Sequence, residues 1–458
     1  MTQKKKVGIV SLGCPKNRVD TERMLGILSG RGHIITSEEK EADVLIVNTC
    51  GFIESAKEES IDAILDLAQY KKNGRCQRLI VTGCLSQRYG RELIDEIPEI
   101  DYITGIADPT VISNIVDNDN GIKRIWIEGP APPSDEDGER ILTTPPYTAY
   151  VKIAEGCSNR CSFCIIPALR GPFRSRPLES IIKEVRNLAD RGVKEINLIS
   201  QDTTMYGMDL RMKDGLVRLL KDLVNIEGIQ WIRLLYCYPT FITKELIDVM
   251  GKEEKICRYI DLPLQHIHND ILKGMCRQER DRDIKDLLMF IRDKIPDITI
   301  RTTFIVGFPC ETEGHFQYLY DFVKEMRFER IGVFTYSREE GTEAGRLRDQ
   351  VPEKVKMERF DSIMRLQQGI SLEHNKRLIN TIQSLLVHGH IEPTSLCVAP
   401  RQVTDNSPLI TGRLMSQAPE VDGIVYLKDS DVEIGEILPI KITGAMEYDL
   451  VGEVCKGG

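Results

Sequence analysis

The sequence predicts an α/β protein whose last part is a small all-β barrel. Strand-length apolar runs alternate with helical stretches over residues 1–128, and six strand–helix units follow one another from about 147 to 337. Such alternation is typical of parallel sheets. After about residue 381, short alternating stretches are separated by Gly, Pro and Asp, which predicts a small antiparallel β-barrel. A chain of 458 residues also exceeds what one hydrophobic core usually organises.

The N-terminal part is predicted as an open parallel sheet with strands at 6–12, 43–48 and 78–82. It ends at a stretch, 129–138, whose prolines, glycines and acids can neither pair in a sheet nor pack, which predicts an exposed linker. We therefore expect domains at 1–128, 147–380 and 381–458, with the linker at 129–146.

The central part is predicted as a regular series of strands and helices. The helical pattern at 178–191 begins after Pro177 and ends before Gly192. Six such units indicate a parallel sheet, which the pattern alone leaves either doubly wound or curved into a partial barrel. The predicted strands are 150–154, 196–200, 232–236, 259–262, 299–306 and 331–335.

A long helix over 351–374 is predicted to connect the central part to the barrel. Barrel strands are predicted at 383–387, 423–427 and 438–442. The buried stripe of the connecting helix is expected to contain Met357, Phe360, Ile363, Met364 and Ile370.

Composition limits the location of the protein and the roles of its cysteines. No apolar run reaches the roughly 18 residues that cross a bilayer, and a strand-length run stands where a signal peptide would have its core. We therefore expect a cytoplasmic protein without membrane partners, with a monomer as the default. Thirteen cysteines are many for a reducing compartment, so clustered cysteines indicate metal binding or catalysis.

The strongest motif is a C-x3-C-x2-C run formed by Cys157, Cys161 and Cys164, directly after a predicted strand. A loop this short can wrap three thiolates around one small object. A four-iron four-sulfur cluster accepts a thiolate at each iron, so three thiolates leave one iron open. An incomplete zinc site or a chance run of cysteines is the alternative.

With Phe163 before its last cysteine, this motif resembles the hallmark of the radical S-adenosylmethionine (SAM) superfamily. The resemblance implies that the open iron chelates SAM and that an electron from the cluster cleaves it to a 5′-deoxyadenosyl radical. It also implies a partial β/α barrel with the cluster at the carboxyl ends of the strands, where barrel active sites form.

Three further cysteines share one context: Cys14, Cys50 and Cys84 each follow a predicted strand of the N-terminal part and lie beside a glycine. In one parallel sheet all three emerge at its carboxyl edge, where α/β folds bind ligands. The sequence therefore predicts a second three-thiolate cluster site. Packing of free cysteines at strand ends is the alternative.

The whole chain resembles the methylthiotransferase family, which combines a three-cysteine domain, a radical SAM core and a C-terminal β-barrel of the TRAM type, similar to an OB-fold. The resemblance implies two four-iron four-sulfur clusters and two SAM molecules per reaction. The second cluster carries or supplies the sulfur, one SAM methylates it, and the other activates the substrate carbon to give C–S–CH3.

Within that family, the motif S-L-G-C-P-K-N at 11–17 resembles the branch that modifies an aspartate, at its β-carbon, in small-subunit ribosomal protein twelve. The motif A-P-E-V-D-G at 418–423 is also similar to that branch. The alternative is the branch that modifies position 2 of an adenosine in tRNA, which usually has Gln-Met or a similar pair at 15–16. Another radical SAM enzyme with an auxiliary cluster and a non-catalytic iron–sulfur protein are more distant alternatives.

Charge favours the ribosomal protein over RNA as the substrate. The whole chain carries a net charge of −9, and from residue 382 onward eleven acidic residues face five basic ones. Such a barrel is expected to repel a phosphate backbone and to attract a basic ribosomal protein. An acidic surface that serves only solubility is the competing interpretation.

Polar residues at the ends of the barrel strands are expected to line the SAM pocket, by resemblance to the superfamily. They are Gln201, Gln265, Arg301 and Thr303, with Phe163 beside the cluster. Cys310 stands where the family commonly has glycine, and we expect it to be a strained but tolerated substitution and not a ligand. A reductase or flavodoxin-type electron donor and a source of sulfur complete the expected partners.

Overall fold

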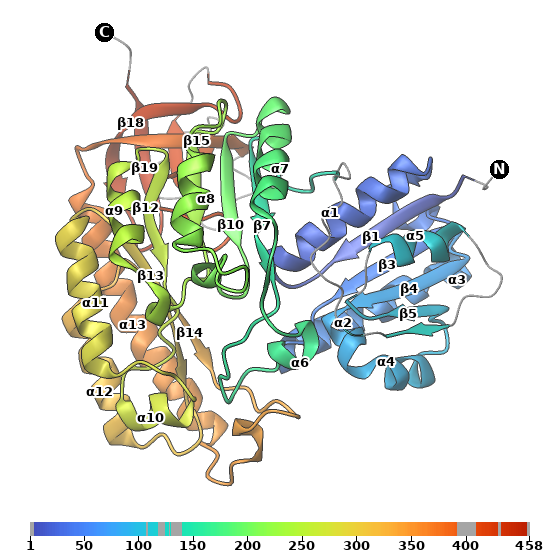
Figure 1. The fold of residues 1–458 in the computed structure, drawn as a ribbon, viewed down its shortest axis with the longest axis horizontal. Helices are drawn as coiled ribbons and strands as arrows, with labels where there is room; N and C mark the ends of the chain where they lie inside the picture. Colours follow the sequence, from blue (N-terminus) through green and yellow to red (C-terminus); the bar gives the residue numbers. More distant parts are fainter. Residues whose placement is uncertain are drawn as a thin grey trace.

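The structure is a computed structural model. It describes residues 4–106, 109–117, 124–127, 129, 140–391, 409–428 and 432–455. Two parallel sheets and a closed barrel make up this part of the chain, with the N-terminal sheet beside the central one and the barrel at the far end of the central sheet (Figure 1). None of the helices within the described ranges is long and apolar enough to cross a membrane.

The N-terminal sheet has the order β2-β1-β3-β4-β5-β6 with every pair parallel. Its strands are β1 (Lys6–Ser11), β2 (Ile34–Ile35), β3 (Val44–Thr49), β4 (Arg78–Gly83), β5 (Tyr102–Thr104) and β6 (Ile125–Trp126). The helices are α1 (Pro15–Gly30), α2 (Glu54–Ala68), α3 (Tyr70–Asn73), α4 (Cys84–Glu96) and α5 (Pro109–Asp117). The order reverses between β1 and β3, and such a switch point is where open α/β sheets bind ligands.

Both faces of this sheet are covered, as the apolar run in β3 requires. Leu45 and Val47 pack in a cluster with residues of α2 and α4. Val44 and Ile46, which alternate with them, pack in another cluster with residues of α1 and α5. The period of two along the strand therefore places one pair of helices on each face.

The central sheet runs in the order β14-β13-β12-β11-β10-β7 and is also parallel throughout. Because each strand lies beside the next one in the chain, right-handed crossovers place all the helices on one face. This order decides between the two predicted possibilities: the sheet is a partial barrel and is not doubly wound. Figure 1 shows the helices along its outer side.

The elements of the partial barrel alternate as the sequence predicts. The strands are β7 (Thr148–Lys152), β10 (Glu195–Ile199), β11 (Trp231–Leu234), β12 (Ile256–Asp261), β13 (Thr299–Val306) and β14 (Arg330–Thr335). The covering helices are α7 (Leu178–Asp190), α8 (Gly215–Leu223), α9 (Lys244–Lys252), α11 (Asp281–Lys294), α12 (Glu313–Met326) and α13 (Glu353–Arg377). Shorter elements between them are β8 (Ala154–Glu155), α6 (Ile166–Arg170), β9 (Arg174–Ser175) and α10 (Asn269–Gly274).

The inner face of the partial barrel remains partly open. Along β13, Ile300, Thr302 and Phe304 are fully buried toward the helices. Arg301 and Thr303, which alternate with them, are only half-buried. The inner face therefore has room to receive a ligand at the strand ends.

The helix α13 corrects one sequence expectation. Ile363 and Ile370 are buried as predicted, but Met357 is 49% exposed. Lys356 and Arg359 are buried in its place, where they donate to the carbonyl oxygen of Tyr336 and to the Glu311 carboxylate. Phe360 and Met364 pack half-buried against the core, so the expected stripe is wrong at Met357, where the helix lies against polar loops that need hydrogen-bond donors.

The C-terminal domain is a closed barrel in the order β15-β16-β17-β19-β18. Four of its pairs are antiparallel as predicted, whereas β17 and β19 pair in parallel. The strands are β15 (Ile382–Ile391), β16 (Leu409–Leu414), β17 (Val425–Lys428), β18 (Ile437–Ala445) and β19 (Leu450–Val454).

The turn that follows β16 joins this barrel to the other two domains. Asp422 accepts a hydrogen bond from the Tyr259 hydroxyl at 2.8 Å and lies 3.7 Å from the Arg301 guanidinium. Glu420 forms an ion pair with Arg18 on α1. The motif at 418–423 therefore joins the three domains, with Asp422 enclosed and Glu420 exposed but paired with Arg18.

Most of the predicted linker lies outside the described residues. Its beginning, Gly129, is exposed, whereas Arg140 near its end is buried beside the carboxylates of Glu22 and Glu184. This end of the segment therefore packs between α1 and α7 as part of the interface between the two parallel sheets.

Candidate active site between two sets of cysteines

The first set of cysteines lies at the switch point of the N-terminal sheet. Cys14 follows β1, Cys50 follows β3, and Cys84 follows β4 as the first residue of α4. The thiols are close enough that Cys14 and Cys84 both influence the pKa of Cys50. The structure thus brings together the three cysteines that the sequence placed at one sheet edge.

Two glycines make this close approach possible. Gly13 has φ +86°, and a Cβ there would lie 2.7 Å from the Cβ of Cys50. Gly83 has φ +102°, and a Cβ there would lie 2.5 Å from the Asn48 side-chain oxygen. Any larger residue would strain the backbone and separate the loops.

The second set lies in the loop between β8 and α6. The N–H of Cys157 donates to the carbonyl of Gly171, and Ser162 donates from its backbone and its hydroxyl to the end of α10. Cys157, Cys161 and Cys164 line a hollow of about 460 Å³ together with residues 341–343. The loop is therefore held on both sides while its thiols face one space.

Both sets of cysteines lie in the part of the chain that the structure describes, and neither has the close spacing of a site for one metal ion. Within the described residues, the only metal-binding group whose ligand atoms all lie within 4.8 Å of one another contains no cysteine. A four-iron four-sulfur cluster binds each thiolate at a different iron, so it does not require the three sulfurs to meet at one ion.

Burial suppresses the ionisation of most of these thiols. It raises the pKa of Cys157 and of Cys50 to about 11 and that of Cys164 to about 12. Coordination to a metal deprotonates a thiol, so iron would supply the missing positive charge. Cys14 differs, because burial raises its pKa but Lys16 and Arg170 outweigh that effect and leave the pKa below the ordinary value.

A buried ionic network lies between the two sets. Arg170, the last residue of α6, donates to the Glu155 carboxylate at 2.8 Å and to the Asn17 side-chain oxygen at 2.5 Å. Its guanidinium also lies 3.6 Å from the Cys84 sulfur. Glu155 accepts a second contact from Lys152 at 2.7 Å, and these two cations hold the pKa of the Glu155 carboxyl well below its usual range despite burial.

Lys16 crosses from the N-terminal sheet to the mouth of the partial barrel. Its ammonium lies 3.5 Å from the centroid of the Tyr236 ring and 3.3 Å from the carbonyl oxygen of Ser200. Tyr236 has φ 60°, an uncommon conformation for a bulky residue and one that clusters at functional sites. Burial lowers the pKa of Lys16, and the neighbouring Cys14 opposes that shift.

Comparison with known families divides the chain into the same three parts. Residues 6–105 match the Uncharacterized protein family UPF0004, residues 151–323 match the Radical SAM superfamily, and residues 401–455 match the TRAM domain.

Full-length relatives decide the family. The chain is 49% identical over 453 residues to the "Ribosomal protein uS12 methylthiotransferase RimO" of Geotalea uraniireducens, covering 98% of each chain. A relative of the same name from Desulforamulus reducens is 50% identical over 457 residues, covering 98% of this chain and 99% of the other. This chain belongs to the uS12 methylthiotransferase family. Its cofactors, as a member of the family and of the radical SAM superfamily, are four-iron four-sulfur clusters and SAM.

A solved structure supports the fold of this methylthiotransferase. The radical SAM methyltransferase TsrM of Kitasatospora setae aligns with a TM-score of 0.56 at 14% identity, over 83% of this chain and 81% of that one. At that identity the likeness concerns the fold alone.

The residues predicted to line the SAM pocket lie around the mouth of the partial barrel. Gln201 donates to Glu155 at 3.2 Å, and Gln265 adopts φ 68° while its N–H donates to the carbonyl of Thr303. Arg301 forms an ion pair with Asp261 at 3.3 Å. Phe163 is half-buried and packs against an apolar cluster that contains Met275 and Phe308.

Sequence reasoning did not assign roles to Lys16, Asn17, Glu155, Arg170 and Tyr236. For the first two a signal existed, because they directly follow Cys14 in the S-L-G-C-P-K-N motif. Arg170 and Tyr236 carry no such signal, since only the fold brings them between the two sets. We call the region around Lys16, Glu155, Arg170 and Tyr236 the gap.

Among the other described cysteines, Cys276 lies near the loop set, since it influences the pKa of Cys161. Cys310 has φ 68°, as the substitution for glycine implied, and it is exposed with its sulfur 3.9 Å from Asp349. Cys76, Cys237 and Cys257 are buried, whereas Cys276 is exposed and Cys455 is half-exposed. Cys397 lies outside the described residues.

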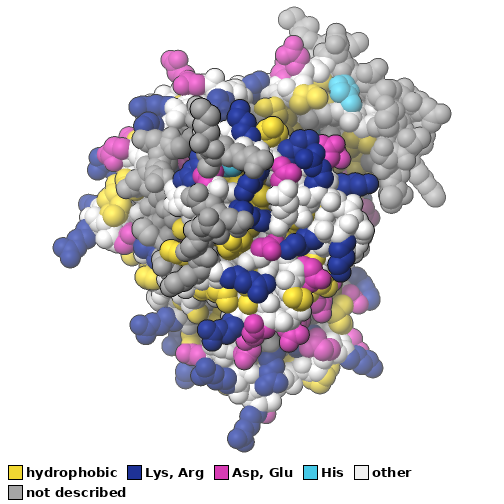
Figure 2. All heavy atoms as spheres, turned by 90° about the vertical axis from the view of Figure 1, so that its right-hand side faces the viewer, with side chains coloured by type: hydrophobic (Ala, Val, Ile, Leu, Met, Phe, Trp, Pro, Cys, Tyr) yellow, Lys and Arg dark blue, Asp and Glu magenta, His cyan; other side chains and the backbone are white. Residues whose placement is uncertain are grey.

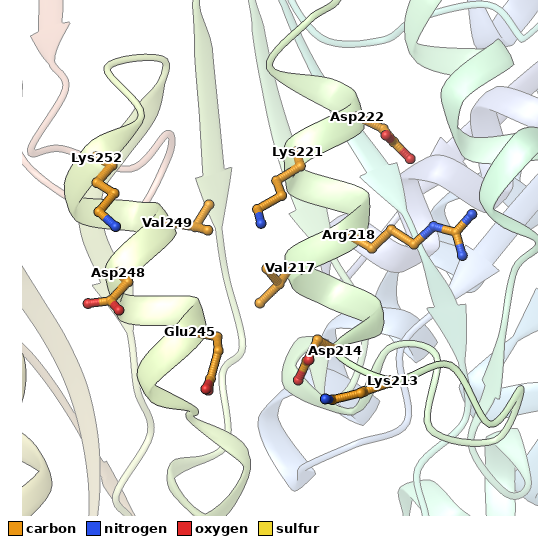
Figure 3. A pocket seen from close by; sticks show the side chains of 10 residues that line it. All are labelled: Lys213, Asp214, Val217, Arg218, Lys221, Asp222, Glu245, Asp248, Val249 and Lys252. Atoms are coloured by element: carbon orange, nitrogen blue, oxygen red, sulfur yellow. The ribbon is translucent and has the colours of Figure 1, made fainter.

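Two other features of the described residues bring charged or metal-binding side chains together. His268, Asp270 and His315 bring ligand atoms within 4.8 Å, but Nδ1 of each histidine accepts a backbone N–H at the start of α10 or α12. Metal-bound imidazoles normally donate from their second nitrogen, so these hydrogen bonds favour helix capping. A hollow between α8 and α9 is lined by four basic and four acidic side chains on the outer face of the barrel (Figure 3).

Proposed function

We propose that this methylthiotransferase adds a methylthio group to the β-carbon of an aspartate in ribosomal protein uS12. The observation that carries the proposal is the full-length identity of about 49% to relatives named for that substrate. In this assignment, Cys157, Cys161 and Cys164 hold one four-iron four-sulfur cluster, and Cys14, Cys50 and Cys84 hold the other. When bound, the clusters and SAM supply the electron, the hydrogen-abstracting group, the methyl group and the sulfur.

The residues of the chain position these groups and exclude water. Asn17 ties the loops of the N-terminal set together by donating to the carbonyls of Leu12 and Thr49. Arg170 joins that set to the helix after Cys164, so the two sites keep a fixed relation. Gln201, Gln265, Arg301 and Thr303 form the polar mouth at which SAM is expected to bind, beside Phe163.

Fewer acidic side chains of the barrel are free to attract a basic partner than the sequence indicates. Asp422 is bound to Tyr259 and Arg301 inside the protein, whereas Glu420 is exposed and pairs with Arg18. Of the other acids of the barrel in the described ranges, Glu433, Glu436 and Glu453 are exposed. These three remain to attract a basic ribosomal protein.

On the side of the N-terminal domain, basic and acidic side chains are interspersed and no single sign dominates (Figure 2). A tRNA backbone usually meets a clustered basic surface, so this face gives the tRNA alternative no support.

The same proposal includes the domain bounds, the location of the enzyme and its partners. We place the domains at 1–128, 147–380 and 381–458 with the connecting segment at 129–146, and the enzyme in the cytoplasm. A reductase or flavodoxin-type protein delivers the electrons, and a separate sulfur source replenishes the transferred sulfur.

The experiment is anaerobic reconstitution with iron and sulfide, followed by incubation with dithionite, SAM, purified uS12-containing ribosomal subunits and tRNA. Mass spectrometry of the protein and of the nucleosides then locates the product. One SCH3 in place of one H on an aspartate of uS12 supports the proposal. The same gain on an adenosine, with uS12 unmodified, contradicts it.

A further inference from the structure

In the part of the chain that the structure describes, several buried or half-buried cations lie near the region between the two cysteine sets, and Lys16 differs from Lys152, Arg170 and Arg301. Lys152 contacts Glu155 and Asp20, Arg170 contacts Glu155, and Arg301 contacts Asp261. Among the described residues, Lys16 has no carboxylate oxygen within the 4.0 Å of an ion pair, although it is only 8% exposed. It contacts one carbonyl and one aromatic ring, and the Cys14 thiol is the ionisable neighbour with the largest effect on its pKa.

A buried cation without a carboxylate in contact is costly to a protein, and one neighbouring thiol offsets that cost only in part. A carbonyl at 3.3 Å and the face of a tyrosine compensate only part of the hydration that Lys16 loses. An ammonium group has three N–H donors, and the structure records one acceptor. The position is therefore that of a group prepared to receive an anion.

The surroundings fix this ammonium at the gap. Tyr236, over whose ring it lies, is held on both sides, since its N–H donates to Asp261 at 2.9 Å and its carbonyl accepts from Thr203 at 2.9 Å. These bonds maintain the unusual φ of Tyr236 and thus the place of the ring. Lys16 itself stands two residues after Cys14 at the start of α1.

The chemistry of the substrate supplies the matching anion. In an aspartate the carboxylate is bonded directly to the β-carbon that reacts, so a residue that binds the carboxylate also places the reacting carbon. We infer that Lys16 binds the side-chain carboxylate of the target aspartate and selects aspartate over asparagine. This inference rests on the proposed function.

The test compares two peptides of the uS12 loop, with aspartate or asparagine at the target position, on the anaerobic holoenzyme. Binding is measured by calorimetry for the unaltered enzyme, Lys16→Met, Lys16→Arg and Lys71→Met. Lys71 is a matched control, because it pairs with Asp101 at 2.7 Å within the same domain but away from the gap.

We expect the unaltered enzyme and Lys71→Met to prefer the aspartate peptide by roughly ten- to hundredfold, the range for a hydrogen bond to a charged group. Lys16→Met should bind both peptides alike, and Lys16→Arg should keep part of the preference. An unchanged preference in Lys16→Met overturns the inference.

Iron content and the electron paramagnetic resonance of the reduced clusters show whether Lys16 binds the substrate carboxylate or instead stabilises the N-terminal cluster. Both should be unchanged in Lys16→Met, and loss of the N-terminal cluster in Lys16→Met and Lys16→Arg overturns the inference. The proposed function is judged separately, by product formation in the unaltered enzyme. If the unaltered enzyme modifies uS12 but Lys16→Met still prefers the aspartate peptide, only this inference is contradicted. If the preference for the aspartate peptide depends on Lys16 but the unaltered enzyme never modifies that aspartate, only the proposed function is contradicted.

Discussion

The two cysteine sets differ in how the chain builds them and in the charges around them. Cys157, Cys161 and Cys164 lie in one loop, whereas Cys14, Cys50 and Cys84 come from the ends of three strands. Within the N-terminal set, Lys16 and Arg170 lower the pKa of Cys14, whereas burial raises the pKa of Cys50 and Cys84, as it does at all three cysteines of the loop. A short loop and the ends of three distant strands therefore each gather three thiols, but only the strand ends place one of those thiols beside two cations.

The largest expected effect separates the roles of the two sets. Cys161→Ala should abolish both the reductive cleavage of SAM and methylthio transfer, because it removes a thiolate of the loop set. Cys50→Ala should leave SAM cleavage detectable while abolishing transfer. Chromatography of 5′-deoxyadenosine together with mass spectrometry of uS12 measures both. Equal loss of SAM cleavage in the two variants would contradict separate roles.

The next effect concerns the ionic network that joins the sets. Arg170→Met leaves the buried Glu155 with one cation fewer and should destabilise the protein by about 3–5 kcal/mol, the cost of breaking a buried pair. Thermal unfolding under anaerobic conditions measures the loss. Arg282→Met, which removes an exposed pair with Asp286, is the control and should cost less than about 1 kcal/mol. Equal costs in the two variants would show that the network is not stabilising.

A pH effect is expected where α1 meets the partial barrel. Although burial opposes it, Arg176, Arg140 and Arg23 lower the pKa of Glu184 from 4.5 to about 2. A depressed carboxyl pKa stabilises the folded state above the unfolded value, so this contribution is complete above about pH 5 and is lost as the pH falls through 4.5 toward 2.

Unfolding in urea at pH 7 and at pH 4 tests that expectation. Glu184→Gln should lower stability at pH 7 more than at pH 4, so that its difference from the unaltered protein narrows in acid. A difference that stays constant with pH would show that Glu184 does not titrate with folding.

The smallest effect separates an incidental cysteine from the two sets. Cys310→Gly should stabilise the protein by about 0.5–1 kcal/mol or leave it unchanged, because glycine relieves the strain of φ 68° but also loosens the unfolded chain. Iron content and activity should not change. Loss of iron in this variant would show that Cys310 is a ligand after all.

The loop set could be predicted from the spacing of its cysteines, because all three lie within eight consecutive residues. The N-terminal set could be predicted from strand ends, since parallel strands bring the residues after them to one edge of the sheet. Arg170 could not, because its helix reaches Cys84 only once the two sheets are packed together. The buried Lys356 and Arg359 escaped prediction for a similar reason, since distant loop carbonyls and carboxylates set their burial.

The central claim is that two independent cluster sites flank one gap. Iron quantification with Mössbauer spectroscopy on two triple variants tests it most directly. One variant replaces Cys14, Cys50 and Cys84 with alanine, and the other replaces Cys157, Cys161 and Cys164. We predict that each retains half of the iron of the unaltered enzyme, as one intact four-iron cluster. If either variant retains all of its iron, or loses all of it while remaining folded, the claim is contradicted.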